Sequence, residues 1–418
     1  MAYLITQIEL AQPLGAIAVP ADHTGVALIV RRGGRPVGFV MEELPAGGRL
    51  APDEIQRLLE ARIKPYLLNG DDAATEPHAT VPRSLTVAIC TRDHPDDLAR
   101  CLGSLERQRS AGWPFQILVV DNAPSTDATA RLAAARPEVR YILEPMPGLN
   151  FARNRAVAEA DTEMLAFIDD DVTVDPHWLD GLRHAVTAHP DAGAVTGLVL
   201  PAELATPAQV LFEKRGGFEK KFDTIRYGAT LPGHPFYPCV GGKFGTGCNM
   251  AFQRKVLLEL GGFDEALDTG PPLPGGGDTD MLYRVVRAGH PLVYEPRFLL
   301  FHRHRREIDA LRRQYSRSWG QGLMAFVAKS YGSDPEQRSN LRRLVRWWFG
   351  NELRELYDSL RGRHVLPPDM LWAELCGGIL GILGAYPRSR RLIERIRRQY
   401  SAAMSARGST AARPTALR

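Results

Sequence analysis

The fold of this chain is decided by one stretch, Leu165-Ala166-Phe167-Ile168-Asp169-Asp170-Asp171, in which an apolar run ends in three acids. A short apolar run bounded by polar residues is typical of a buried strand. Side chains alternate along an extended segment, so we expect Asp169 and Asp171 on one face and Asp170 on the other. Paired carboxylates suit Mg²⁺ or Mn²⁺ bridging to phosphate, whereas the alternative is a solvated acidic loop.

Strand and helix patterns alternate outward from this stretch. We expect strands at 85–90, 116–120, 139–143 and 164–168, and helices at 95–108, 126–135, 150–160 and 176–188. Four such units in a row predict an α/β domain with a mostly parallel sheet flanked by helices, in which ligands bind beyond the carboxyl ends of the strands. The residues at these ends are Thr91-Arg92-Asp93, Asp121-Asn122, Glu144-Pro145 and Asp169-Asp170-Asp171.

The remaining sequence predicts two further regions around a core domain at 81–305. Residues 1–80 contain short strand patterns and one helix, closed by a polar linker at 70–77, which predicts a small β-rich domain of unknown role. Residues 306–418 are rich in arginine. We expect helices there at 308–331, 338–360, 369–385 and 389–403, and a disordered tail at 402–418.

Two polar clusters late in the core domain are candidates for chemistry. Asp278 and Asp280 fall in the first turn of a helix expected at 281–288. An acid at such a place either caps the helix or takes part in catalysis, and we assign Asp280 the structural role. His302 and His304 follow an apolar run; one imidazole could complete a metal site, and a basic surface loop is the alternative.

A third candidate is the helix start that follows the strand at 139–143. Gly148 and the amides of the first helical turn, with Arg153 and Arg155, could receive an anionic group. The segment has no GxGxxG fingerprint, and residues 242–247 do not match the phosphate-binding P-loop. Dinucleotide-binding and NTPase functions are therefore disfavoured.

Seven segments, taken together and in order, resemble family 2 of the glycosyltransferases, whose members have the GT-A fold. The resemblance covers about 85–305, half of the chain. Each segment alone is a weak signal, whereas seven in the right order are specific. The segments are Thr86-Val87-Ala88-Ile89-Cys90-Thr91-Arg92, Ile117-Leu118-Val119-Val120-Asp121-Asn122, residues 148–154, Ala166-Phe167-Ile168-Asp169-Asp170-Asp171, Gly247-Cys248-Asn249-Met250-Ala251-Phe252, Gly262-Phe263-Asp264 and Gly276-Gly277-Asp278-Thr279-Asp280.

The resemblance implies transfer with inversion from a nucleotide-diphosphate sugar donor, with Mn²⁺ or Mg²⁺ as cofactor. Asp278 falls where the family's catalytic base stands. Asp169, Asp171 and His302 would lie at the metal, with His302 favoured over His304. The residues implied to bind the donor are Thr91, Arg92, Asp121, Arg153, Asn154, Asp169 and Asp170.

One departure from the family concerns the base. The family usually has Glu-Asp where this chain has Gly277-Asp278, so the base lacks its acidic neighbour. Handling of the acceptor is therefore less firmly predicted than handling of the donor.

We expect a metal-dependent glycosyltransferase that builds a cell-surface polysaccharide or glycolipid, and thus acts on a glycan or lipid-linked acceptor. One alternative is a nucleotidyltransferase acting on a sugar phosphate, which the lack of a glycine- and lysine-rich phosphate loop near the first strand disfavours. The other is a non-catalytic glycan-binding scaffold, against which the intact Asp169, Asp171 and Asp278 count.

Charge is divided unequally along the chain. The net charge of +4 conceals 23 Arg and Lys against 10 Asp and Glu in residues 301–418, and 29 against 38 in residues 1–300. With Trp347-Trp348-Phe349 among arginines, the basic end predicts association with an anionic membrane surface; the alternative is a helical subdomain packed on the core. No nucleic-acid-binding motif is recognised.

Five cysteines without CxxC spacing, and no basic leader, predict a cytoplasmic protein, free or peripheral on the inner face of the cell membrane.

Overall fold

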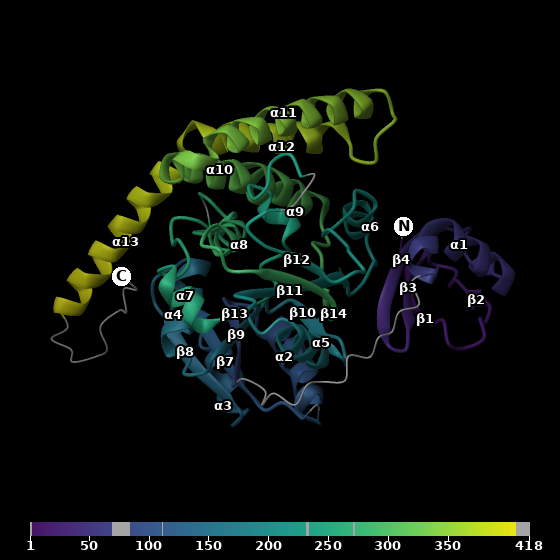
Figure 1. Cartoon of the computed structure of the whole chain (residues 1–418), viewed down its shortest axis with the longest axis horizontal. Helices are drawn as coiled ribbons and strands as arrows, with labels where there is room; N and C mark the ends of the chain where they lie inside the picture. The colour runs from purple at the N-terminus through teal and green to yellow at the C-terminus, as the bar shows by residue number, and fades with distance from the viewer. Residues whose placement is uncertain (1, 69–83, 111, 231–233, 271, 407–418) are drawn as a thin grey trace.

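The computed structural model describes residues 2–68, 84–110, 112–230, 234–270 and 272–406, so the expected linker at 70–77 and the tail beyond 406 lie outside the described residues. Its centre is a nine-stranded sheet in the order β10-β14-β11-β13-β9-β6-β7-β8, with β12 paired to β14 (Figure 1). One apolar core contains residues of α4, α7 and α8, and the other contains residues of α2 and α5. Helices therefore cover both faces of the sheet, which confirms the predicted α/β class.

The four expected strand–helix units form the parallel half of the sheet. β6 is parallel to β7 and β9, and β7 is parallel to β8. β6 and β9 are almost entirely buried because helices cover both of their faces. The elements are β6 (Leu85–Thr91), α2 (Pro95–Glu106), β7 (Phe115–Asn122), α3 (Ala128–Ala134), β8 (Val139–Glu144), α4 (Leu149–Glu159), β9 (Met164–Ile168) and α5 (Trp178–Ala188).

The other half of the sheet is mixed. β13 runs antiparallel to β9 and β11, β10 and β12 run antiparallel to β14, and β11 is parallel to β14. The elements are β10 (Val172–Val174), β11 (Ala194–Pro201), α6 (Pro207–Lys214), β12 (Ile225–Tyr227), β13 (Asn249–Gln253), α7 (Arg254–Glu259), α8 (Gly277–Arg287) and β14 (Leu292–His302), with 3₁₀ turns η1 (Arg107–Ser110) and η2 (Gly241–Lys243).

Strand register brings the predicted polar residues to one edge of the sheet. Thr91 and Asp121 are partners across β6 and β7, and β9 ends one residue before Asp169. β10 pairs with β14 so that Val172 lies opposite His302. Residues far apart in sequence therefore meet beyond the carboxyl ends of the strands, where ligands bind in open α/β sheets.

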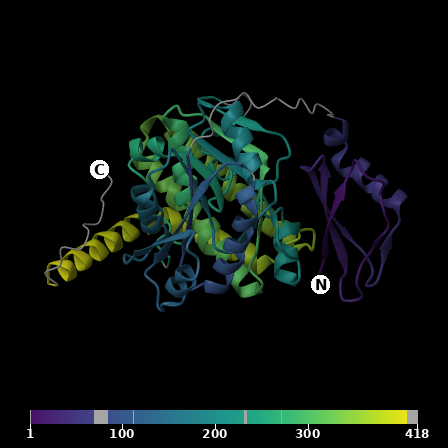
Figure 2. The same cartoon turned by 90° about the horizontal axis from the view of Figure 1, so that it is seen from below.

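The N-terminal residues form a separate small sheet beside the large one (Figures 1 and 2). An ion pair between Arg31 and the buried Asp175, and a bond from the backbone N–H of Tyr3 to the carbonyl oxygen of Leu204, join it to the core. The elements are β1 (Leu4–Glu9), β2 (Ile17–Ala18), β3 (Gly25–Arg32), β4 (Arg35–Glu43), β5 (Arg49–Leu50) and α1 (Pro52–Leu68).

The C-terminal region is helical, as expected. α10 packs on α8, where Tyr283 shares an apolar cluster with Met324 and Phe326, and α11 and α12 form a further layer on α10 (Figure 1). The elements are α9 (Ile308–Arg313), the π-helical η3 (Gln314–Gln321), α10 (Gly322–Ser333), the 3₁₀ turn η4 (Pro335–Gln337), α11 (Arg338–Leu360), α12 (Pro368–Leu380), the π-helical η5 (Gly381–Ala385) and α13 (Tyr386–Ala406).

One helical segment of the described residues, Pro368–Ala402, is long and apolar enough to cross a membrane, by length and composition only. Its most apolar window is 44% buried inside the protein. The segment also bends at Gly384, whose φ of 103° lies outside the helical region.

Candidate active site

Three metal-ligating side chains converge at the carboxyl edge of the sheet. One ligand atom each from Asp169, Asp171 and His302 lies within 4.8 Å of the others, and Nε2 of His302 is 3.4 Å from Oδ1 of Asp171. The pairing of β10 with β14 explains why His302 reaches Asp171 from 131 positions further along the chain. Oδ1 of Asp171 is buried and has no hydrogen-bond partner among the described residues. Two carboxylates and an imidazole with an unsatisfied oxygen fit a divalent cation.

The electrostatics of this triad also favour a cation. Burial, then the neighbouring Asp171, raises the pKa of Asp169 to about 7, while Arg153 acts in the opposite direction. Burial lowers the pKa of His302 to about 4, so its imidazole is neutral near pH 7 and free to coordinate a metal. A bound cation would offset the repulsion between the two carboxylates.

His304 lies behind His302 and does not contact Asp171 in the described contacts. Nδ1 of His304 is 3.1 Å from Nδ1 of His302, and its Nε2 is 2.8 Å from Oε1 of Glu213. A carboxylate only accepts, so Nε2 of His304 donates to Glu213. When both rings are neutral, Nδ1 of His302 then donates to Nδ1 of His304, which leaves the Nε2 lone pair of His302 directed at the triad. The geometry thus favours His302 as the ligand and gives His304 an orienting role.

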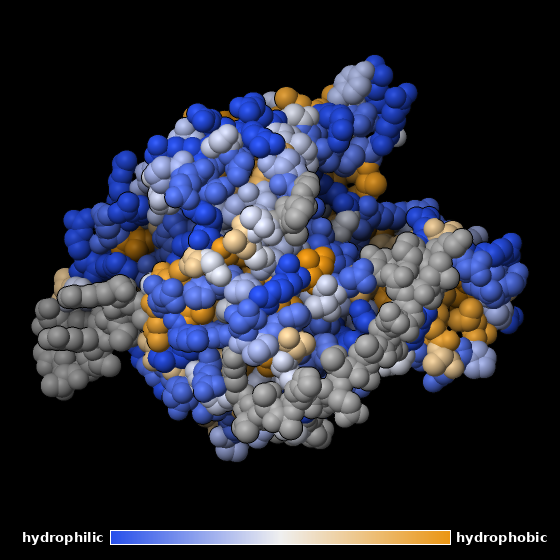
Figure 3. All heavy atoms as spheres, viewed as in Figure 1, coloured by the Kyte–Doolittle hydropathy of each residue, from blue (hydrophilic) through white to orange (hydrophobic). Residues whose placement is uncertain are grey.

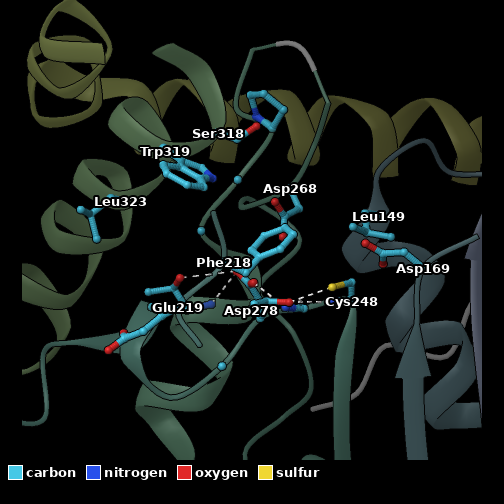
Figure 4. A pocket seen from close by; sticks show the side chains of 18 of the residues that line it. Leu149, Asp169, Phe218, Glu219, Cys248, Asp268, Asp278, Ser318, Trp319 and Leu323 are labelled. Atoms are coloured by element: carbon cyan, nitrogen blue, oxygen red, sulfur yellow. Dashed lines mark hydrogen bonds between the residues drawn. The ribbon is translucent and has the colours of Figure 1, made fainter. Parts of the chain in front are cut away.

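A cavity of about 450 Å³ opens beside the triad and contains Asp278 (Figure 4). Oδ2 of Asp278 accepts from the backbone N–H of Gly247 at 2.8 Å, and Oδ1 accepts from that of Thr279 at 2.7 Å. In the close-up, Asp169 lies at one end of the cavity and Leu323 at the other, with Asp278 between them. Of the predicted site residues, Arg153, Asp169 and Asp278 line this cavity.

Arg153 lies among the acids of the cavity. It pairs with Asp268, an acid that the sequence did not indicate. Nη1 of Arg153 is buried 3.1 Å from Oδ1 of Asn150 and 3.3 Å from Oδ2 of Asp268. Burial raises the pKa of Asp268 to about 6 against the lowering effect of Arg153, and Asp278 raises it further. Asp268 therefore acts electrostatically on both Arg153 and the candidate base.

Asp268 also corrects the expectation that the base lacks an acidic neighbour. Oδ2 of Asp268 accepts from the N–H of Gly277 at 3.0 Å. A Cβ at Gly277 would lie 2.3 Å from that oxygen and 2.3 Å from Nδ2 of Asn150, which donates to two backbone carbonyls. Position 277 has no room for a side chain because the carboxylate of Asp268 already occupies the space.

Asp121 and Thr91 lie at the predicted donor edge. Asp121 is fully buried; its Oδ2 accepts from the hydroxyl of Tyr141 at 3.0 Å, whereas Oδ1 has no partner among the described residues. Burial raises the pKa of Asp121. A buried acceptor without a partner costs free energy unless a ligand satisfies it, which supports the prediction for Asp121.

The structure also places the other four residues predicted to bind the donor, Thr91, Arg92, Asn154 and Asp170. Oδ2 of Asp170 accepts from the hydroxyl of Thr91 at 2.5 Å, so both residues fix the loop after β9. Asn154 binds the backbone N–H and C=O of Phe263 and does not line the cavity. The side chain of Arg92 is 53% exposed, and its Nε lies 3.8 Å from Oδ2 of Asp93.

Comparison with known proteins identifies the core domain. Residues 86–261 match the model of the family described as glycosyl transferase family 2. The pre-mycofactocin glycosyltransferase of Mycobacterium tuberculosis is 24% identical over 281 residues, which are 66% of this chain and 55% of that protein. The succinoglycan biosynthesis protein ExoM of Rhizobium meliloti is 29% identical over 51% of this chain and 64% of its own length.

A solved structure also aligns with the chain. The mannosyltransferase PcManGT from Pyrobaculum calidifontis, in complex with GDP-Man and Mn²⁺, is 20% identical, with a TM-score of 0.48 over 77% of this chain and 92% of that one. The chain spans little more than half the length of the mycobacterial relative, so the family match concerns a domain. The match over residues 86–261 therefore supports a family 2 glycosyltransferase domain in this chain.

Proposed function

We propose that the protein transfers a sugar, with inversion, from a nucleoside-diphosphate sugar to an acceptor hydroxyl. The observation that carries the proposal is the place of Asp278, which lines one cavity together with Asp169 of the metal-ligating triad. A cation held by Asp169, Asp171 and His302 would neutralise the charge of the leaving diphosphate. The sugar donor and the base thus occupy the same cavity.

Other residues of the site have separate roles in the transfer. Asp278 takes the proton of the acceptor hydroxyl, with its carboxylate held by the N–H groups of Gly247 and Thr279. Arg153 is buried among the acids and stabilises negative charge on the donor side. Asp121 offers its unpartnered oxygen to the nucleoside. Inversion requires the base and the leaving group to lie on opposite faces of the sugar.

The direct test is nucleoside-diphosphate release from a panel of UDP- and GDP-sugars, with Mn²⁺ or Mg²⁺ and with EDTA. We expect turnover of at least one donor that EDTA abolishes and Mn²⁺ or Mg²⁺ restores. Pyrophosphate release from an NTP and a sugar phosphate would instead indicate a nucleotidyltransferase. Nucleotide binding without turnover of any donor would indicate a non-catalytic scaffold.

The orienting pair His304–Glu213 gives a prediction about the metal. Glu213→Gln should raise the Kd for Mn²⁺ by roughly 10–100-fold, the usual effect of losing a partner that orients a metal ligand. Titration calorimetry with Mn²⁺ measures it. Glu203→Gln is the control, because Glu203 contacts Arg306 and Gln209 but neither histidine in the described contacts. An unchanged Kd in Glu213→Gln would show that His302 needs no such support.

For the acceptor we propose a hydroxyl of a cell-surface polysaccharide or glycolipid, reached from the cytoplasmic side of the membrane. The similarity to the Rhizobium meliloti succinoglycan biosynthesis protein ExoM supports a polysaccharide product. Assays of transfer to extracted glycolipid and to soluble oligosaccharide would separate the two acceptor classes.

A further inference from the structure

We infer that α11, α12 and η5 form a docking face for an anionic lipid surface, from which a lipid-linked acceptor reaches Asp278. The inference rests on the proposed function and deepens it by choosing the lipid-linked class of acceptor.

Exposed apolar surface is concentrated on these helices. Outside residues 347–383, the described chain exposes three large hydrophobic side chains, Leu143, Ile308 and Tyr331. Inside that window it exposes ten, of which Leu360 at 70% and Leu383 at 67% are the most exposed. Figure 3 shows hydrophobic surface at the protruding end of this helical layer, beside hydrophilic residues. Concentrated apolar surface of this kind marks an interaction site.

On α11 the apolar side chains alternate with arginines. The exposed positions recur every three or four residues along one stripe, and no acid is among them. The exposed side chains of the stripe include Arg342, Arg346, Trp347, Leu353, Tyr357 and Leu360. Apolar and basic side chains on one stripe suit the interface of an anionic bilayer, where the rings and aliphatic groups insert and the guanidinium groups meet lipid phosphates.

α12 carries a second group of exposed apolar side chains. Its exposed apolar residues Trp372, Ile379 and Leu380 lead into Leu383 of η5. α11 and α12 cross where Trp348 packs on Gly378, whose Cβ, if present, would lie 2.5 Å from the Trp348 ring. The two exposed stripes therefore belong to neighbouring helices.

The opposite side of α12 is fixed to the protein. Glu374 is buried and pairs with Arg215 of the core. Nearly half of the most apolar window of this segment is buried, and the segment bends at Gly384. These contacts favour a helix that lies on a bilayer over one that crosses it.

The same layer borders the catalytic cavity. Trp348 of α11 and Leu323 of α10 line the cavity that contains Asp278, whereas the next residue, Trp347, is 51% exposed. One helix thus carries a cavity wall on one side and the amphipathic stripe on another. The layer proposed to meet the membrane is therefore also a wall of the cavity that contains the proposed base.

The positive charge of the docking face favours a lipid surface over a second copy of the chain as its partner. A symmetric dimer through this face would bring the arginine stripes of both copies together, and like charges at an interface are unfavourable. Arg342 and Arg346 have no acidic partner among the described residues. The inner leaflet carries negative charge that would supply such partners.

The test is flotation of the full chain with vesicles of phosphatidylcholine alone or with added phosphatidylglycerol. We expect binding to the anionic vesicles that falls with salt. Arg342→Glu with Arg346→Glu should weaken it roughly tenfold or more, and so should Trp372→Ser with Leu383→Ser. Arg107→Glu and Leu143→Ser are matched controls with exposed side chains elsewhere, expected to bind as the wild type does.

Equal binding to both vesicle types, or binding unchanged in the two double variants, would overturn the docking face. So would a lipid-free dimer that Trp372→Ser with Leu383→Ser dissociates in analytical ultracentrifugation. Donor hydrolysis without vesicles keeps the two proposals apart. Hydrolysis without vesicle binding refutes the docking face alone, and vesicle binding without turnover of any donor refutes the proposed function alone.

Discussion

Asp278→Asn should lower kcat for sugar transfer by about 10³-fold, the usual contribution of a general base. The amide oxygen can keep one of the two contacts to the N–H groups of Gly247 and Thr279, whereas the NH2 group accepts neither a hydrogen bond nor the proton of the acceptor hydroxyl. Binding of the nucleoside diphosphate should change little, because the triad of Asp169, Asp171 and His302 is intact.

Steady-state transfer and calorimetric binding of the nucleoside diphosphate with Mn²⁺ measure the two effects separately. Glu219→Gln is the matched control, because Glu219 also lines the cavity but is 38% exposed and pairs with Lys243. Its kcat should stay within a few-fold of the wild type. Transfer by Asp278→Asn at the wild-type rate would mean that another group removes the proton.

Arg215→Met should destabilise the fold by about 3–5 kcal/mol, the usual cost of stranding a buried charge. The guanidinium of Arg215 pairs with Glu374, lies 3.5 Å from Oε1 of Glu352 and 3.2 Å from Oε2 of Glu355, and stacks 4.8 Å from the centre of the Tyr315 ring. The side chains of Glu352 and Glu374 are each 4% exposed. Without Arg215, two buried acids of α11 and α12 would face each other without a cation.

Denaturant unfolding at several pH values measures this cost. Burial, then Glu374, raises the pKa of Glu352 to about 8 from 4.5, although Arg215 lowers it. The folded state therefore holds this proton more tightly than the unfolded state, so its contribution to stability is complete below pH 4.5 and is lost as pH rises towards 8. Removing Arg215 takes away its lowering effect on the pKa of Glu352, so the loss should extend to higher pH.

The control for this prediction is Arg312→Met. Arg312 pairs with Asp309 and Asp369, but its side chain is 39% exposed, so we expect a loss below about 1 kcal/mol. Equal losses of unfolding free energy in Arg312→Met and Arg215→Met would show that burial of the Arg215 cluster adds nothing to the stability of the fold.

The sequence predicted the parallel half of the sheet, because its strands and helices follow from local residue patterns. The runs of β6 and β9 and the helices after them follow from residue periodicity, and Asp169 and Asp171 follow from their place at a strand end. The contact of His302 with Asp171 depends on the pairing of β10 with β14, which no local pattern encodes. The interruption of the expected helix at 308–331 by η3 likewise depends on packing.

Two acids of the site gave no usable sequence signal. Glu213 lies in α6, 91 residues before His304, and becomes its partner only in the folded chain. Asp268 lies before a run of prolines and glycines, where an acid is typical of a turn. Its left-handed backbone, with φ of 55°, directs the carboxylate to Arg153, and that conformation is not readable from residue type.

The position of Asp268 affects how aligned sequences of this family should be compared. A column-by-column comparison scores Gly277 as the loss of an acid, although the number of carboxylates around Asp278 is maintained from a position nine residues earlier. Because the space at Gly277 admits one carboxylate, relatives with Glu there should carry a small or uncharged residue at the position of Asp268. The two positions should therefore covary, and a glycine in that column is a poor criterion for discarding a sequence as inactive.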